Sequence, residues 1–407
     1  MKIVRFNSKK LDKIYNRGFL KNRRIEERVK KIIDEVRLLG DEALAKYTKK
    51  FDKVKLSARQ FKVSEMEISS AYQNISPNFV SSLKVIIENV NRFYRKQFRK
   101  PWKMKDADGT IIGEKYQPLE KVGIYIPAGT APLVSTVYMT VLPARAAGVK
   151  KIVLVSPPDK NGNINPHILV IANLLKVDEI YKVGGAQAIA ALAYGTKTIP
   201  RVDKIVGPGN SYVSEAKRQV FGIVDIDMIA GPTELVIIAN RYSDPKFVIA
   251  DLKAQAEHAG GLAILITNSK ALAREVSSQV ENNGFIILTK NLEQAVDIAN
   301  RIAPEHLEIL LKNPQRLVKK IKHAGAIFLG LFSPTAVGDY IAGPSHVLPT
   351  SGTARFSSGL SLYDFIKSSH VINYSKKSLD KAREALEKIA TIEGLTKHLE
   401  SVKARLS

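Results

Sequence analysis

The sequence predicts an α/β protein with two doubly wound parallel sheets. Short apolar runs alternate with helical segments in two series, one over residues 121–220 and one from residue 235 onward. This alternation is typical of parallel sheets that carry helices on both faces. The chain has 407 residues, which is too long for a single hydrophobic core. We therefore expect two Rossmann-like α/β/α domains, with small helical segments at the N- and C-terminal ends.

The first part of the chain reads as helices and one hairpin. Apolar residues recur every three or four positions over 24–44, which predicts an amphipathic helix with Gly40 as its stop or kink. A second helix is expected over 77–98, because Pro101 then breaks the pattern. Asp108-Gly109 has the composition of a hairpin turn.

The strands of the two sheets are expected at the apolar runs. Those of one sheet are 122–126, 152–155, 179–183 and 204–206, and those of the other are 235–239, 263–267, 285–289 and 326–329. A long amphipathic helix from Ser378, interrupted at Gly394, ends the sequence. The expected division is an N-terminal helical segment 1–22, a first α/β domain from 23–120 with 235–360, a second α/β domain 121–234, and a C-terminal helical tail 361–407.

The amino-acid composition excludes several classes of function. There is no cysteine, which excludes disulfides, thiolate metal sites and cysteine nucleophiles. The net charge is +24, but no nucleic-acid-binding motif accompanies it, so we expect a solvated basic surface and no specific nucleic-acid partner. No apolar run is long enough for a membrane span, and the charged first residues do not form a signal segment. The expected location is the cytoplasm.

Three glycine-containing turns follow expected strands, at 127–130, 184–187 and 207–210. Glycine at a strand end lets backbone N–H groups approach a ligand, and open α/β sheets bind ligands at such ends. None of the turns has the GxGxxG fingerprint of the Rossmann dinucleotide site. By themselves they predict a phosphate-bearing or polar ligand.

Several polar residues are candidates for metal binding and proton transfer. Gln255 and His258 are three positions apart on an expected helix and therefore share a face. The tandem pair Glu305-His306 suits acid–base chemistry. Asp339 and His346 lie in a loop rich in Gly, Pro and Ser. A zinc site could use Gln255, His258, Asp339 and one further His, which predicts a cytosolic α/β metalloenzyme without defining its substrate.

Several motifs together resemble the histidinol dehydrogenase family. They occur in the family's order at residues 184–192, 202–210, 215–219, 226–234, 255–258, 304–307, 338–340 and 346–350. The resemblance extends over nearly the whole chain, from about Ile25 to Arg405. It implies NAD- and zinc-dependent oxidation of L-histidinol through L-histidinal to L-histidine, in two hydride transfers, by a homodimer with shared active sites.

The resemblance also implies residue roles. Zinc would be bound by Gln255, His258 and Asp339, with His398 contributed by the neighbouring subunit. Glu305 and His306 would be the acid–base pair. The remaining substrate contacts would be Thr233, His346 and Glu393, and the NAD contacts would be Tyr125, Gln187 and Asn210. Ala128 stands where the family often has glycine, which could reshape the cofactor loop.

Three alternatives remain at this stage. A zinc-dependent hydrolase would use Glu305 to activate water, but it leaves the three ligand-facing turns without a role. A nucleic-acid-binding protein with a vestigial core would account for the charge. A dehydrogenase of another amino alcohol is also compatible with the motifs, although His346 and Glu393 argue against it.

Overall fold

The computed structural model describes all residues except 7, 19–21, 129–131, 259, 282–283 and 407. The chain divides into two units. The first comprises Met1–Gln97 and Leu119–Phe365, and the second comprises Phe98–Pro118 and Ile366–Ser407. Two parallel sheets belong to the first unit and a small antiparallel sheet belongs to the second. Along the described chain, no helix combines the length and the apolar character that crossing a membrane requires.

The five-stranded sheet has the order β6-β5-β4-β7-β8 and every pairing in it is parallel. Its strands are β4 (Lys121–Tyr125), β5 (Lys151–Ser156), β6 (Glu179–Lys182), β7 (Lys204–Val206) and β8 (Asp225–Ile226). The chain runs outward from β4 to β6 and then returns to β7 on the other side of β4. This reversal makes the sheet doubly wound, as expected, with its switch point at the carboxyl ends of β4 and β7.

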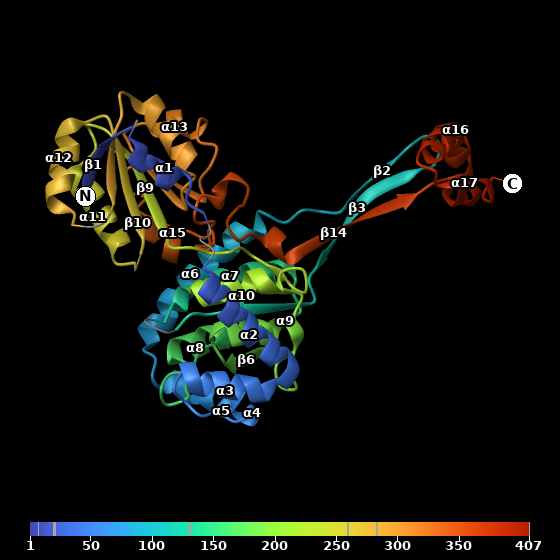
Figure 1. The fold of residues 1–407 in the computed structure, drawn as a ribbon, viewed down its shortest axis with the longest axis horizontal. Coiled ribbons are helices and arrows are strands. Elements are labelled where there is room, and N and C mark those ends of the chain that lie inside the picture. The colour runs from blue at the N-terminus through green and yellow to red at the C-terminus, as the bar shows by residue number, and fades with distance from the viewer. Residues whose placement is uncertain (7, 19–21, 129–131, 259, 282–283, 407) are drawn as a thin grey trace. The chain divides into compact units, whose positions relative to one another are not determined.

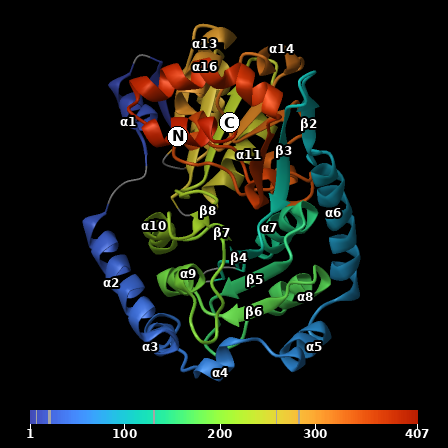
Figure 2. The same cartoon turned by 90° about the vertical axis from the view of Figure 1, so that its right-hand side faces the viewer.

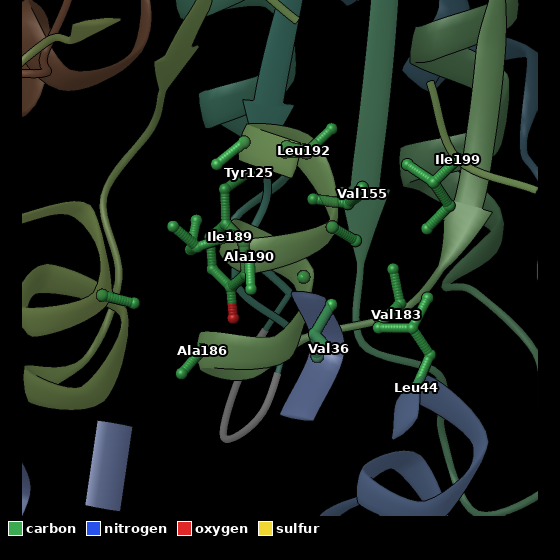
Figure 3. Close-up of a cluster of buried hydrophobic side chains, with 14 of the residues drawn as sticks. Val36, Leu44, Tyr125, Val155, Val183, Ala186, Ile189, Ala190, Leu192 and Ile199 are labelled. Carbon is green, nitrogen blue, oxygen red and sulfur yellow. The ribbon is translucent and has the colours of Figure 1, made fainter. Parts of the chain in front are cut away.

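Nine helices of the described chain accompany this sheet, and we call the whole the five-stranded layer. They are α2 (Arg23–Leu39), α3 (Asp41–Phe51), α4 (Ala58–Phe61), α5 (Glu65–Gln73), α6 (Pro77–Arg95), α7 (Val134–Ala147), α8 (Pro166–Leu174), α9 (Gly185–Tyr194) and α10 (Ser211–Val220). Helices α2, α9 and α10 lie on one side of the sheet, and α6, α7 and α8 lie on the other (Figure 2). Figure 3 shows part of the core on the α2 side, where Val36 and Leu44 join side chains from α9 and from β4 and β5.

Residues 23–95 differ from the expected division, which assigned them to the domain of residues 235–360. The buried stripe of α2 (Val29, Ile32, Ile33 and Val36) packs on α9 and α10, while α6 packs on α7 and α5 on α8. The expected helix 24–44 is two helices, because Gly40 has a φ of +56° and ends α2. The periodicity of an amphipathic helix gives its buried face, but it does not identify the sheet that covers that face.

The six-stranded sheet has the order β1-β11-β10-β9-β12-β13, again entirely parallel. Its strands are β1 (Lys2–Arg5), β9 (Glu234–Ala239), β10 (Leu262–Thr267), β11 (Phe285–Leu288), β12 (His306–Leu310) and β13 (Ala326–Leu329). Strand β1 pairs with β11 at the sheet edge, so the N-terminal segment 1–22 is not only helical as expected. A strand of four residues with two charged side chains has no pattern that would reveal it.

Helices cover both faces of the six-stranded sheet (Figure 1). They are α1 (Asp12–Tyr15), α11 (Pro245–Ala256), α12 (Lys270–Gln279), α13 (Leu292–Ile302) and α14 (Gln315–Val318). Helix α15 (Thr335–Tyr340) follows β13 and has no buried residue. Side chains of α11 and α12 fill the core on one face, and those of α1 and α13 fill the core on the other. The predicted fold class of two doubly wound parallel sheets is therefore confirmed.

The second unit is an antiparallel sheet followed by two helices. Its elements are β2 (Trp102–Lys105), β3 (Ile111–Pro118), β14 (Ile366–Asn373), α16 (Lys376–Ile392) and α17 (Thr396–Lys403), with the sheet order β14-β3-β2. The hairpin expected around Asp108-Gly109 is confirmed, as is the helix interruption at Gly394. The tail 361–407 was expected to be helical, but β14 occupies its first part because it pairs with β3 over eight residues.

Candidate active site

The candidate acid–base pair lies where two neighbouring strands of the six-stranded sheet begin. Ala303, with a φ of +47°, ends α13 and turns the chain so that Glu305 and His306 lead into β12. Thr233 precedes the neighbouring strand β9, whose Leu235 is in register with His306. This edge is formed by the amino ends of the strands, whereas open α/β sheets bind ligands at the carboxyl ends.

Glu305 is buried and held by two donors. Its Oε2 accepts hydrogen bonds from the Thr233 hydroxyl at 2.6 Å and from the Glu234 amide at 2.9 Å. Burial raises the pKa of the Glu305 carboxyl to about 7, although the imidazole of His306 and the two hydrogen bonds oppose this rise. A carboxyl group with a pKa near neutrality can both accept and return a proton under physiological conditions.

His306 has a defined tautomer. Its Nδ1 lies 3.1 Å from the backbone carbonyl of Glu234, which can only accept, so Nδ1 carries the hydrogen. Its Nε2 is buried without a hydrogen-bond partner among the described residues and lies 3.6 Å from Oδ1 of Asp339. Burial lowers the pKa of His306, but the carboxylates of Glu305 and Asp339 outweigh burial and raise it to about 9. Because Nδ1 is engaged by the Glu234 carbonyl, Nε2 is the ring nitrogen that is available to gain or lose a proton.

Asp339 and His346 meet beside this pair. The Nδ1 of His346 donates to the backbone carbonyl of Asp339 at 2.9 Å, and its Nε2 lies 3.3 Å from the hydroxyl of Thr136 on α7. Burial lowers the pKa of His346, so its neutral form accepts the hydroxyl hydrogen of Thr136. The Tyr138 hydroxyl, also on α7, donates to the Tyr340 carbonyl. These contacts join helix α15 to the five-stranded layer.

The expected metal ligands of the first unit belong to separate elements. Gln255 is buried on α11, and its Nε2 has no hydrogen-bond partner in the described part of the chain. His258 is exposed in the turn after α11, and Asp339 is on α15. Among the described residues, no three His, Asp or Glu side chains stand together with metal-binding geometry. The amide, imidazole and carboxylate donors suit zinc chemically, and the unpaired buried amide fits a ligand.

Two of the expected NAD contacts lie together in the five-stranded layer. Tyr125 ends β4, and its hydroxyl accepts the amide hydrogen of Gly185 at 3.1 Å. Gln187, in the first turn of α9, is buried, and neither its Oε1 nor its Nε2 has a hydrogen-bond partner among the described residues. A buried amide with both ends unpaired is rare in folded proteins, so it marks this turn as a place for a polar ligand.

The third expected NAD contact, Asn210, already uses its side-chain oxygen in a helix cap. Asn210 caps the N-terminus of α10, where its Oδ1 accepts from the amides of Tyr212 and Val213. The first glycine turn, 127–130, lies partly outside the described residues, because positions 129–131 are not described. The other two turns follow β6 and β7, as the sequence predicts.

Glu393 and His398 both belong to the second unit. Glu393 is the C-cap residue of α16 and His398 is in α17, and both side chains are exposed. The roles expected of them as substrate contact and metal ligand stay predictions.

Glu234 was not among the predicted site residues, although it contacts both members of the pair. Its amide donates to Glu305 and its carbonyl accepts from His306. Its carboxylate forms an ion pair with Arg17, a residue 217 positions earlier that no motif singled out. The only sequence signal was an acidic residue at the start of an apolar strand, a place where an unpaired charge would be costly.

Comparison with known proteins identifies the family. The model of the histidinol dehydrogenase family matches residues 15–406. The chain belongs to the histidinol dehydrogenase family. A histidinol dehydrogenase of Clostridium acetobutylicum is 49% identical, covering 94% of this chain and 93% of its own. One of Carboxydothermus hydrogenoformans is 47% identical, with 100% of both chains covered.

A solved structure agrees with this assignment. The crystal structure of histidinol dehydrogenase from Elizabethkingia anophelis superposes with a TM-score of 0.94 at 37% identity, covering 100% of this chain and 98% of the other. The resemblance inferred from the motifs is thus confirmed. Enzymes of this family catalyse the NAD-dependent, two-step oxidation of histidinol to histidine, and the chain is an oxidoreductase of this family.

Proposed function

We propose that the protein oxidises L-histidinol through L-histidinal to L-histidine and reduces two NAD in the process. The observation that carries the proposal is the buried pair formed by Glu305 and His306. One imidazole nitrogen is fixed by the Glu234 carbonyl, while the other lies beside Asp339 and has no hydrogen-bond partner among the described residues. Each oxidation of an alcohol or of a hydrated aldehyde releases one proton with the hydride, so it requires a base at the reacting oxygen.

His306 is the base for the alcohol in this proposal. Its Nε2 accepts the hydroxyl proton, and the resulting imidazolium is stabilised by the neighbouring carboxylates. When Asp339 is engaged by a cation, part of that stabilisation is lost and the imidazole is more readily neutral. Glu305 removes a proton from the water that adds to the aldehyde, for which a pKa raised to about 7 is suited. Because the chain has no cysteine, the aldehyde reacts as its hydrate and not as a thioester.

Two bound groups complete the proposed site. Gln255, His258 and Asp339 would hold zinc together with His398 of the partner subunit, in a homodimer with shared sites. Bound zinc would supply no redox chemistry and would orient the substrate by binding the substrate's nitrogen atoms. Tyr125, Gln187 and Asn210 contact NAD, which accepts the hydride. Thr233, His346 and Glu393 contact the substrate. The carboxylate of Glu393 binds the substrate's ammonium group.

The proposed partners and cellular location follow from this reaction. The substrate is a small molecule, so neither a membrane nor a specific nucleic acid is needed as a partner. We infer that the enzyme works in the cytoplasm, where NAD is available.

The first test is absorbance at 340 nm with purified protein, L-histidinol and NAD. We expect about two NADH per histidinol, as the two oxidations require. Activity should be lost on chelation and restored by zinc. His306→Ala should still bind zinc yet turn over about 100-fold or more slowly, since general base catalysis contributes on that order. Failure to form NADH with a metal-loaded protein would refute the proposed substrate, and chelator resistance would refute the zinc role.

A further inference from the structure

Arg17 forms a two-point ion pair with Glu234. Its Nε lies 2.6 Å from Oε1, and its Nη2 lies 2.6 Å from Oε2. Both side chains are largely withdrawn from solvent, with 14% of Arg17 and 4% of Glu234 exposed. Nη1 of Arg17 donates to the carbonyl of Ile14, which fixes the guanidinium to the end of α1. Paired N–H donors of this geometry form one of the strongest polar contacts in proteins.

Every polar group of Glu234 is used at the catalytic pair or next to it. The backbone amide donates to the Glu305 carboxyl, and the backbone carbonyl accepts from Nδ1 of His306. The side chain also accepts from the Ser351 amide at 3.0 Å and, at 3.4 Å, from the Glu305 amide. Glu234 therefore orients both reacting side chains from one position.

The charge of Glu234 makes this arrangement dependent on Arg17. Two carboxyl groups, those of Glu234 and Glu305, are buried at the same strand ends. A buried carboxylate that loses its cation must move toward solvent or take up a proton, since a buried uncompensated charge is strongly unfavourable. Either response would displace the Glu234 backbone, whose amide holds Glu305 and whose carbonyl fixes the tautomer of His306.

We propose that Arg17 is a positioning residue, which holds Glu234 in place so that Glu234 can orient Glu305 and His306. This rests on the acid–base roles of the proposed function. It gives the N-terminal segment a part in the reaction, although Arg17 itself contacts neither reacting side chain in the described hydrogen bonds.

The test compares Arg17→Met, Glu234→Gln and the double variant, after NADH formation by the unchanged enzyme has established the proposed function. Arg17→Met should lower kcat about 10- to 100-fold, because small displacements of reacting groups have effects of that order. KM for histidinol should change less than about threefold, since the loss concerns orientation and not binding. In the double variant the neutral amide no longer needs the cation, so kcat should recover toward that of Glu234→Gln.

Arg23→Met is the matched control. Arg23 also belongs to the N-terminal part and forms an ion pair, with Glu27, but 90% of its side chain is exposed. Its removal should leave kcat unchanged. If Arg17→Met does not fold, Arg17→Lys and Glu234→Gln measure the same dependence.

Two outcomes would overturn the proposal. One is a lowered melting temperature with normal kcat per folded Arg17→Met molecule, which would mean that the pair only stabilises the fold. The other is a double variant as slow as Arg17→Met, since the uncompensated charge would then not be the cause. Both differ from failure of the proposed function, which would abolish NADH formation in the unchanged enzyme.

Discussion

The hydroxyl of Thr233 has a role in the structure other than the expected substrate contact. It donates to the Glu305 carboxyl at 2.6 Å, and this hydrogen bond lowers the pKa of that carboxyl against the effect of burial. Thr233 therefore influences the pH at which the Glu305 carboxyl loses its proton. Substrate contact and this hydrogen bond are compatible, because a hydroxyl can donate one hydrogen and still accept another.

We predict that Thr233→Val raises the pKa of Glu305. Removing a donor to the ionised form destabilises that form, so the acid side of the rate profile should move up by about one pH unit. The measurement is kcat/KM for histidinol from pH 6 to 10. Thr233→Ser keeps the hydroxyl and should keep the unchanged profile. A valine variant with an unshifted profile would mean that this hydrogen bond does not control the rate.

Glu308 connects three elements that carry site residues. It lies on β12, two positions after His306, and its Oε1 accepts from the amide and the hydroxyl of Thr335 at the start of α15. It also faces Asp251 of α11, whose charge adds to burial in raising the pKa of Glu308. The folded protein therefore holds a proton here that the unfolded chain would release at lower pH.

This arrangement predicts a pH-dependent stability. Because the pKa of Glu308 is raised on folding, the free energy of unfolding should fall as pH rises through that raised value. Glu308→Gln cannot ionise but retains the acceptor for Thr335. At pH 9 its free energy of unfolding should therefore be about 1–3 kcal/mol higher than that of the unchanged protein. Urea unfolding at pH 5 and 9 measures the difference. The control is Glu384→Gln, whose side chain is 80% exposed; an equal gain there would contradict the assignment to Glu308.

The extent of sequence-based prediction also varies among the elements. The apolar runs predicted four strands of each parallel sheet, because a strand buried on both faces has a continuous apolar sequence. Strands β8 and β12 were not predicted. Strand β1 was missed because its neighbour β11 follows about 280 residues later. The acid–base pair was predicted because Glu305 and His306 are adjacent. Its support by Arg17 and Glu234 was not, since only folding brings these residues together.

At the scale of the whole molecule, the proposed homodimer can be tested by mixing inactive variants. His306→Ala lacks the base in its own subunit, and His398→Ala lacks the ligand proposed to serve the partner subunit. A mixed dimer then contains one site with both changes and one site with neither. Random mixing should restore about a quarter of the activity of the unchanged enzyme, from half the dimers with one working site each. No recovery in verified mixed dimers would mean that His398 acts within its own subunit.

The order of strands in the six-stranded sheet also bears on synthesis. The five-stranded layer is built from residues 23–226 apart from Phe98–Pro118, which belongs to the second unit, whereas β1 pairs with β11, which follows much later in the chain. On the ribosome, the layer can close first, since domains fold as their segments emerge. Until β11 arrives, the first-made strand has an unpaired edge, which is a site for unwanted association. In a stalled chain ending near residue 260, the five-stranded layer should therefore resist protease while Lys2–Arg5 stays open to cleavage.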